Sequence, residues 1–315
     1  MIDFSWNKFF SSLTQFSHTN FYTEHGGIIF TGSKFSGQIY FTMAQFHAND
    51  LVVFGGVKFT GNIVSFGGAK FFKKGVTFNR TQFLNNDATI GFLDLTIECD
   101  IASFSSMKFF GEVTFFRSQF KVKDSLDFDR TEFKKRCDFT ETIFNCENIS
   151  FTQTNFIEVD FKNSKFGLVS FNNTSFSNAN FTNTKFLSEA YFSDCKFLNL
   201  IRFNSVIFEH PSKIFILTKD LSRISLTNTD ITRIIFSDDA FFGKDSKYKI
   251  YDEKMLEENI TKIPKEDSVT LFENILTVYR NLRDNYEYRM KYEEAGQFFI
   301  REMNLKRNYD VEGYD

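Results

Sequence analysis

Phenylalanine recurs along residues 4–241 with a basic spacing of five, a period that belongs neither to an α-helix nor to a single β-strand. In the most regular stretch, Phe occupies every fifth position from Phe151 to Phe186. The residue two before each of these Phe is small or β-branched, as Thr154 and Val159 illustrate, and the residue between them is mostly polar. Three residues that point in, out and in form a minimal strand. The remaining two positions, largely Asn, Ser, Thr, Gly or Lys, suit a turn. Each unit therefore predicts one short side and one corner of a solenoid.

Before residue 151 the same units come in pairs, and longer steps separate the pairs. The inward partner in the first unit of a pair is usually aliphatic, such as Val52, and in the second it is usually small or hydroxylic, such as Thr81. Two pairs per coil would place like sides opposite each other and keep the core volume constant. We therefore expect a single file of stacked side chains at Phe30, Phe54, Phe78, Phe104, Phe128, Phe151, Phe171 and Phe192. The opposite file would hold Phe41, Phe66, Phe92, Phe115, Phe139, Phe161 and Phe181.

Composition and local motifs strengthen this interpretation. The chain has 46 Phe but only 2 Pro and 1 Trp, which indicates a regular internal stack of rings. Glycine pairs such as Gly55-Gly56 recur with the repeat, so they mark corners where a positive φ is needed. The segment Ala179-Asn180-Phe181-Thr182-Asn183 resembles the consensus of pentapeptide-repeat proteins, and the similarity covers about three quarters of the chain. The resemblance implies a mainly β fold, a right-handed quadrilateral β-helix with four repeats per coil and about ten coils.

The chain changes character after the solenoid, which we place at residues 1–243. Residues 244–267 are charged and contain Pro264, so we expect a connecting segment, followed by a helical hairpin or cap over residues 268–315. An apolar stripe at helical spacing would cover the open end of the solenoid. This predicted end cap consists of Phe272, Ile275, Leu276 and Tyr279.

A second interpretation of the hairpin comes from a short resemblance. Val278-Tyr279-Arg280-Asn281-Leu282 and the segment 294–303 resemble part of larger prokaryotic pentapeptide-repeat proteins, where it often precedes channel-like transmembrane helices. That resemblance implies a linker toward a membrane or a partner. On this interpretation the natural chain continues past residue 315, and the protein lies at the cytoplasmic face of a membrane.

Charge and targeting signals narrow the classes of function. Residues 244–315 carry 13 Lys and Arg against 16 Asp and Glu, so residues 1–243 hold 24 of each and are neutral. A nucleic-acid binder usually has a basic excess and a nucleic-acid mimic an acidic one, so the neutral charge of residues 1–243 argues against both classes. Residues 1–10 lack the features of a signal peptide, and no apolar run reaches membrane-spanning length. We expect a cytoplasmic protein whose Cys137 and Cys195 are reduced core residues.

No residues suggest catalysis, a cofactor or a metal site. His18, His25, His47 and His210 share no ligand spacing, and Cys99 and the other cysteines form no metal motif. A filled core also leaves no cavity for a substrate. We expect a non-enzyme.

One outward pattern suggests binding. The outward residues of successive coils include Lys8, Lys34, Lys58 and Lys108, which would stack into a strip. Such lysines either discourage association or dock an acidic partner or phospholipid surface. The sequence therefore favours a protein-interaction scaffold. Its alternatives are the regulatory domain of a channel-like membrane protein and, third, a DNA mimic that inhibits topoisomerases.

Overall fold

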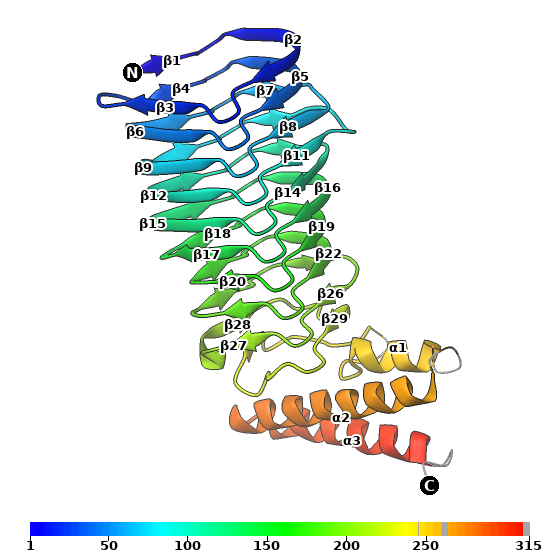
Figure 1. Ribbon diagram of the computed structural model, residues 1–315. Helices are drawn as coiled ribbons and strands as arrows, with labels where there is room; N and C mark the ends of the chain where they lie inside the picture. Colours follow the sequence, from blue (N-terminus) through cyan, green and yellow to red (C-terminus); the bar gives the residue numbers. More distant parts are fainter. Residues whose placement is uncertain (245, 260–261, 263, 311–315) are drawn as a thin grey trace.

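The computed structural model of the protein describes residues 1–244, 246–259, 262 and 264–310. Within these residues thirty short strands form two sheets, and all of the strand pairings are parallel. Each strand pairs with the equivalent strand of the next coil, so the coils stack like rungs from the N-terminus toward three C-terminal helices (Figure 1). The predicted mainly β solenoid followed by a helical hairpin is confirmed.

The two sheets divide the sides of the solenoid between them, and several strands continue around a corner. The first sheet contains β1 (Ile2–Asp3), β3 (Asn20–Thr23), β4 (Ile28–Ile29), β6 (Gln45–Val53), β9 (Lys70–Thr77), β12 (Thr96–Ser103), β15 (Gln119–Asp127), β17 (Ile143–Cys146), β18 (Ile149–Ser150), β20 (Lys165–Phe166), β21 (Val169–Ser170), β23 (Lys185–Phe186), β24 (Ala190–Tyr191), β27 (Ile207–Phe208), β28 (Ile214–Ile216) and β30 (Ile235–Phe236). The second contains β2 (Lys8–Gln15), β5 (Lys34–Tyr40), β7 (Lys58–Phe59), β8 (Ile63–Ser65), β10 (Gln82–Phe83), β11 (Thr89–Gly91), β13 (Lys108–Phe109), β14 (Glu112–Thr114), β16 (Glu132–Asp138), β19 (Asn155–Asp160), β22 (Ser175–Asn180), β25 (Lys196–Phe197), β26 (Ile201–Arg202) and β29 (Ile224–Ser225).

The core consists of stacked phenylalanine rings. From Phe30 to Phe192, consecutive members of the file proposed above stack with ring centroids 4.6 to 5.1 Å apart. Phe4 extends this file at the N-terminal end, and we call the whole set the Phe30 file. Phe41 meets Phe30 edge-on across the interior at 5.7 Å and stacks on Phe66 of its own file. Offset stacks along the axis and edge-on contacts across it are the arrangements that aromatic rings prefer.

Buried hydroxyl groups tie one coil to the next. Thr81 Oγ1 donates to the carbonyl oxygen of Phe54 at 2.6 Å, and Thr131 Oγ1 donates to that of Phe104 at the same distance. Both threonines are fully buried. A hydroxyl at this position fills the small space beside each ring and also satisfies a buried carbonyl oxygen. This double role explains why the second unit of each pair favours Ser or Thr.

The last coils depart from the strict spacing. Counting in fives from Leu221 predicts that Phe241 points inward, but Phe241 is only half-buried and Phe242 is 1% exposed. The Phe242 ring packs edge-on against Phe236 at 5.6 Å and against Phe298 at 5.5 Å. The chain thus shifts by one residue where it leaves the sheet, because the core there is completed by a helix instead of another coil.

Among the described residues, three helices follow the solenoid: α1 (Tyr251–Asn259), α2 (Lys265–Tyr288) and α3 (Tyr292–Asp310). A short 3₁₀ turn, η1 (Pro211–Lys213), lies within the solenoid itself. The segment expected to be only a connection contains α1, and α2 begins three residues before the predicted start of the hairpin. Acidic side chains in the first turn of α1 favour a helix there. Asp252 on this turn accepts hydrogen bonds from Ser225 Oγ at 2.6 Å and from Leu226 N–H at 3.1 Å.

Helix α2 lies across the C-terminal end of the solenoid (Figure 1). Asn285 Nδ2 donates to the carbonyl oxygens of Ile231 and Ile234, both at 2.8 Å. One turn before and one turn after it, Asn281 donates to Thr229 O at 3.4 Å and Arg289 to Phe236 O at 3.0 Å. A coil end leaves strand carbonyl groups without the partner that a further coil would supply, and these side chains take its place. Phe272, Ile275, Leu276 and Tyr279 are buried in the same core as Ile231 and Phe236.

A buried carboxylate joins α2 to α3. Glu302 of α3 is 2% exposed, and it accepts hydrogen bonds from Arg280 at 3.0 Å, Arg283 at 3.2 Å and Lys306 at 2.8 Å. Burial acts to raise the pKa of Glu302, but the hydrogen bonds from Lys306 and Arg280 outweigh it and hold the pKa below its usual value.

We expect Glu302→Gln to destabilise the protein by about 2 kcal/mol at neutral pH, since three cations lose their buried partner but are themselves partly solvated. Because the pKa of Glu302 is lowered in the folded state, its contribution is complete above the unfolded-state pKa and is lost as the pH falls through the folded-state pKa. Urea unfolding at pH 7 and at about pH 3 checks both points. Equal differences between wild type and variant at the two pH values would contradict this prediction.

Candidate functional site

The outward lysines predicted to form a strip occupy equivalent positions in successive coils. Lys8 of β2 pairs in register with Lys34 of β5, and Lys34 with Lys58 of β7. Lys108 also lies on this line, beyond Gln82. However, Lys108 Nζ lies 3.4 Å from a carboxylate oxygen of Glu132. The structure therefore separates Lys108 from the other three lysines.

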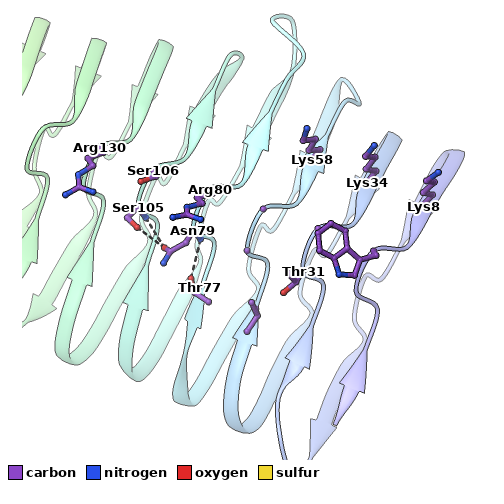
Figure 2. Close-up of a pocket in the computed structure, with 15 residues that line it drawn as sticks. Lys8, Thr31, Lys34, Lys58, Thr77, Asn79, Arg80, Ser105, Ser106 and Arg130 are labelled. Atoms are coloured by element: carbon purple, nitrogen blue, oxygen red, sulfur yellow. Dashed lines mark hydrogen bonds between the residues drawn. The ribbon is translucent and has the colours of Figure 1, made fainter.

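Lys8, Lys34 and Lys58 form one wall of an open groove with a volume of about 940 Å³. Figure 2 shows these lysines side by side on neighbouring strands, with Arg80 and then Arg130 farther along the solenoid. Hydroxyl and amide side chains from the corners line the rest of the groove. Its described lining consists of Trp6, Lys8, Thr31, Gly32, Lys34, Val53, Gly55, Gly56, Lys58, Thr77, Asn79, Arg80, Ser105, Ser106 and Arg130.

The groove is strongly basic although residues 1–243 are neutral as a whole. Its described lining contains five cationic side chains and no carboxylate. Among the described residues, the three lysines and Arg80 have no carboxylate within 4.0 Å, and Arg130 Nε donates to the neutral Gln153 at 3.2 Å. Cations gathered on a concave surface without counter-charges attract and orient an anionic ligand.

The floor of the groove follows from the conformation of the corners. The second residue after each Phe of the Phe30 file has a positive φ, with values of +59° at Trp6, +67° at Gly56 and +61° at Arg80. Gly56 has no heavy atom within 4 Å of where a Cβ would lie, so the groove is open above it. Glycine at this corner therefore removes the side chain that would fill the groove, besides tolerating the left-handed backbone.

An aromatic side chain borders the N-terminal end of the groove. Trp6 is 75% exposed, and a Cβ at Gly32 would come within 2.6 Å of its indole ring. The absence of a side chain at Gly32 thus lets the indole lie flat over the next corner. An exposed indole beside a row of lysines offers apolar and π contacts to a bound ligand.

Hydrogen bonds fix the wall on the side opposite the lysines. Asn79 Oδ1 accepts from Ser105 Oγ at 3.0 Å and from Ser105 N–H at 3.3 Å (Figure 2). The Ser103 hydroxyl also donates to Asn79 Oδ1. This network joins two adjacent coils next to Arg80. The groove therefore has a polar wall that hydrogen bonds within the protein hold in place.

The other candidate groups lie elsewhere in the fold. The four cysteines are free and buried, and burial raises the pKa of Cys99 and of Cys146 to about 12. His47 stacks on Phe72 at 4.5 Å on the outer surface. Within the described part of the chain, no group of His, Cys, Asp and Glu side chains could hold a metal ion. The helices described here all lack the combination of length and hydrophobicity needed to cross a bilayer.

Sequence reasoning identified the lysines of the groove but missed Trp6, Arg80, Arg130 and the role of Gly56. Writing out the second position after each Phe of the Phe30 file would have revealed them. That column runs Trp6, Gly32, Gly56, Arg80, Ser106 and Arg130.

The fold thus defines a repeat protein in which five-residue units form the sides of a parallel solenoid. Residues 145–186 and 154–197 match the family model of pentapeptide repeats, in eight copies. The resemblance to pentapeptide-repeat proteins is confirmed in these residues, which form part of the parallel solenoid. Searches of curated proteins and of solved structures give no match to this chain.

Proposed function

We propose that this protein is a non-enzymatic interaction scaffold that binds an acidic segment of a partner protein in the basic groove over its N-terminal coils. One observation carries the proposal: the groove gathers five cations and no carboxylate among its described lining residues, in a solenoid that is neutral as a whole. A solvated lysine surface that only prevents association needs neither a concave shape nor an exposed indole.

The shape of the site favours a protein segment over a lipid surface. The groove is concave and spans several coils, so its floor at Gly56 lies below the lysine wall. A bilayer surface cannot enter such a groove, whereas an extended polypeptide can place side chains against both walls. The buried free thiols of the four cysteines are suited to a reducing compartment, which supports a cytoplasmic location.

We expect Lys34→Glu combined with Lys58→Glu to abolish partner binding, because it turns a run of positive charge into repulsion for an acidic chain. The matched control is Lys165→Glu combined with Lys185→Glu, since these exposed lysines also pair in register but lie outside the groove. Affinity purification with wild type and both variants should recover the same partner from wild type and control, and lose it from the groove variant.

Two results would contradict the proposal. The first is equal loss of partners in both variants, which would indicate a non-specific charge effect. The second is partner recovery unchanged by the groove substitutions. Sedimentation of the wild type with anionic phospholipid vesicles, abolished only by the groove variant, would replace the protein partner by a membrane surface.

A further inference from the structure

The groove interrupts a regular pattern of hydrogen bonds along one edge of the solenoid. We call the backbone N–H of the residue directly after each Phe of the Phe30 file a corner amide. The outer side chain two residues earlier often accepts its hydrogen bond. Asp3 Oδ1, for example, accepts from Ser5 N–H at 2.7 Å, and Asp127 Oδ1 from Asp129 N–H at 2.7 Å.

Seven of the nine corner amides from Phe4 to Phe192 have a side-chain acceptor. They belong to Ser5, Asn79, Ser105, Asp129, Thr152, Asn172 and Ser193. The other two belong to Thr31 and Gly55, in adjacent coils, and both residues line the groove. No acceptor for these two amides exists among the described residues. The reason is in the sequence, because the acceptor position holds Ile29 in one coil and Val53 in the next.

The two free amides lie among the groove's cations. Thr31 and Gly55 occupy the same coils as Lys34 and Lys58, three residues before each lysine. Adjacent strands are about 4.8 Å apart, so the two amides form a closely spaced pair of donors beside a pair of ammonium groups. Backbone amides at such corners form anion-binding sites when no internal acceptor occupies them.

The occupied corners show which anion fits. A carboxylate oxygen accepts from the corner amide at 2.7 Å in two coils of this edge. On the corners of the opposite file, Asp138 and Asp160 accept in the same way at 2.9 Å. Hydrogen bonds from the Ser5 side chain and backbone lower the pKa of Asp3, as expected for donors that favour the ionised form.

We propose that the corner amides of Thr31 and Gly55 receive carboxylate side chains of the acidic partner segment, which Lys34 and Lys58 hold from the side. The partner's carboxylates thus take the place that Asp3 and Asp127 fill in other coils. This inference rests on the proposed function, and it names the atoms that distinguish an acidic peptide from a generic polyanion.

The test supplies the missing acceptors from within the protein. Ile29→Thr combined with Val53→Thr places a hydroxyl two residues before each free amide, as Thr77 does for Asn79 at 3.3 Å. The matched control is Ile29→Val with Val53 unchanged, because Val and Thr have the same shape. The two proteins have equal charge and differ only in that two hydroxyl groups of the Thr variant replace two methyl groups of the Val control. Unchanged melting temperatures would show that both fold.

The probe is a fluorescein-labelled peptide of eight aspartates, with binding measured by anisotropy at low ionic strength. We expect the Thr variant to bind about tenfold more weakly than the Val control, since two charge-assisted hydrogen bonds must compete with internal ones. Amide resonances of Thr31 and Gly55 should shift when the peptide is added to the wild type, and should not shift in the Thr variant.

The binding results distinguish a failure of the amide inference from a failure of the proposed function. Equal affinity of the Thr variant and the Val control overturns the amide inference, and if Lys34→Gln with Lys58→Gln still weakens binding, the proposed function survives. Tighter binding of an eight-nucleotide single strand than of the peptide overturns the carboxylate assignment. No binding of the peptide to the wild type overturns both.

Discussion

Replacing Phe128 by Ala should destabilise the protein by about 3–5 kcal/mol, because the substitution leaves a cavity in a filled stack. The Phe128 side chain is fully buried, and its ring lies 4.8 Å from both Phe104 and Phe151 in its own file. It also meets Phe115 and Phe139 edge-on across the core, at 5.8 and 5.7 Å. Because every neighbour belongs to a repeating file, none can move in without disturbing the next coil.

Chemical denaturation measures the effect, and Lys58→Ala is its control. Lys58 is exposed on the outer surface, so its removal should change the unfolding free energy by no more than about 0.5 kcal/mol. Similar denaturation midpoints for the two variants would show that the ring stack does not support the fold as described.

Removing residues 265–315 should cost more than about 4 kcal/mol or convert the solenoid into aggregates, because it exposes a core layer and unpaired strand edges. The truncation uncovers Phe242, Ile234 and Phe236, which are each about 1% exposed in the whole protein. It also removes the side chains of α2 that donate to the last carbonyl groups. A monodisperse truncated protein with an unchanged melting temperature would support the linker interpretation of the hairpin.

Point substitutions in α2 provide a graded version of this experiment. Asn285→Asp replaces a donor to two carbonyl oxygens by a carboxylate that repels them, and the site is 1% exposed. We expect it to lose about 2–3 kcal/mol of stability. Asn281→Asp should lose much less, since Asn281 makes one contact at 3.4 Å and is only partly buried.

The five-residue spacing predicted which side chains point inward, because alternation along a short strand depends only on local order. Lys8, Lys34 and Lys58 pair in register for the same reason. The spacing could not reveal that Thr81 bonds to Phe54, since that contact depends on how closely two coils approach. The spacing does place Trp6 and Arg80 in one column of corner positions, but it could not show that this column lines a concave groove, because the shape of the groove depends on how the coils stack.

At the C-terminal end of the solenoid, the sequence predicted the apolar contacts of α2 but not its polar ones. The apolar stripe from Phe272 to Tyr279 was readable as one face of a helix, and these residues are buried. The polar residues Asn281, Asn285 and Arg289 follow the same helical spacing, but nothing local marks them as donors to strand carbonyl groups. Their role is defined only by the open coil edge that they meet, and that edge lies about fifty residues earlier in the chain.

Because the coils stack in parallel with a constant rise, the length of the solenoid is proportional to its number of coils. Each coil adds about 4.8 Å along the axis, so the number of coils between the groove and α2 sets the distance between these two parts of the molecule. Residues 151–170 form one complete coil without a bulge, because Phe171 follows Phe151 in the same file. A gain or loss of such a unit would lengthen or shorten the spacer by a single increment while both ends keep their structure. Evolution can therefore adjust the reach of this protein without redesigning either end.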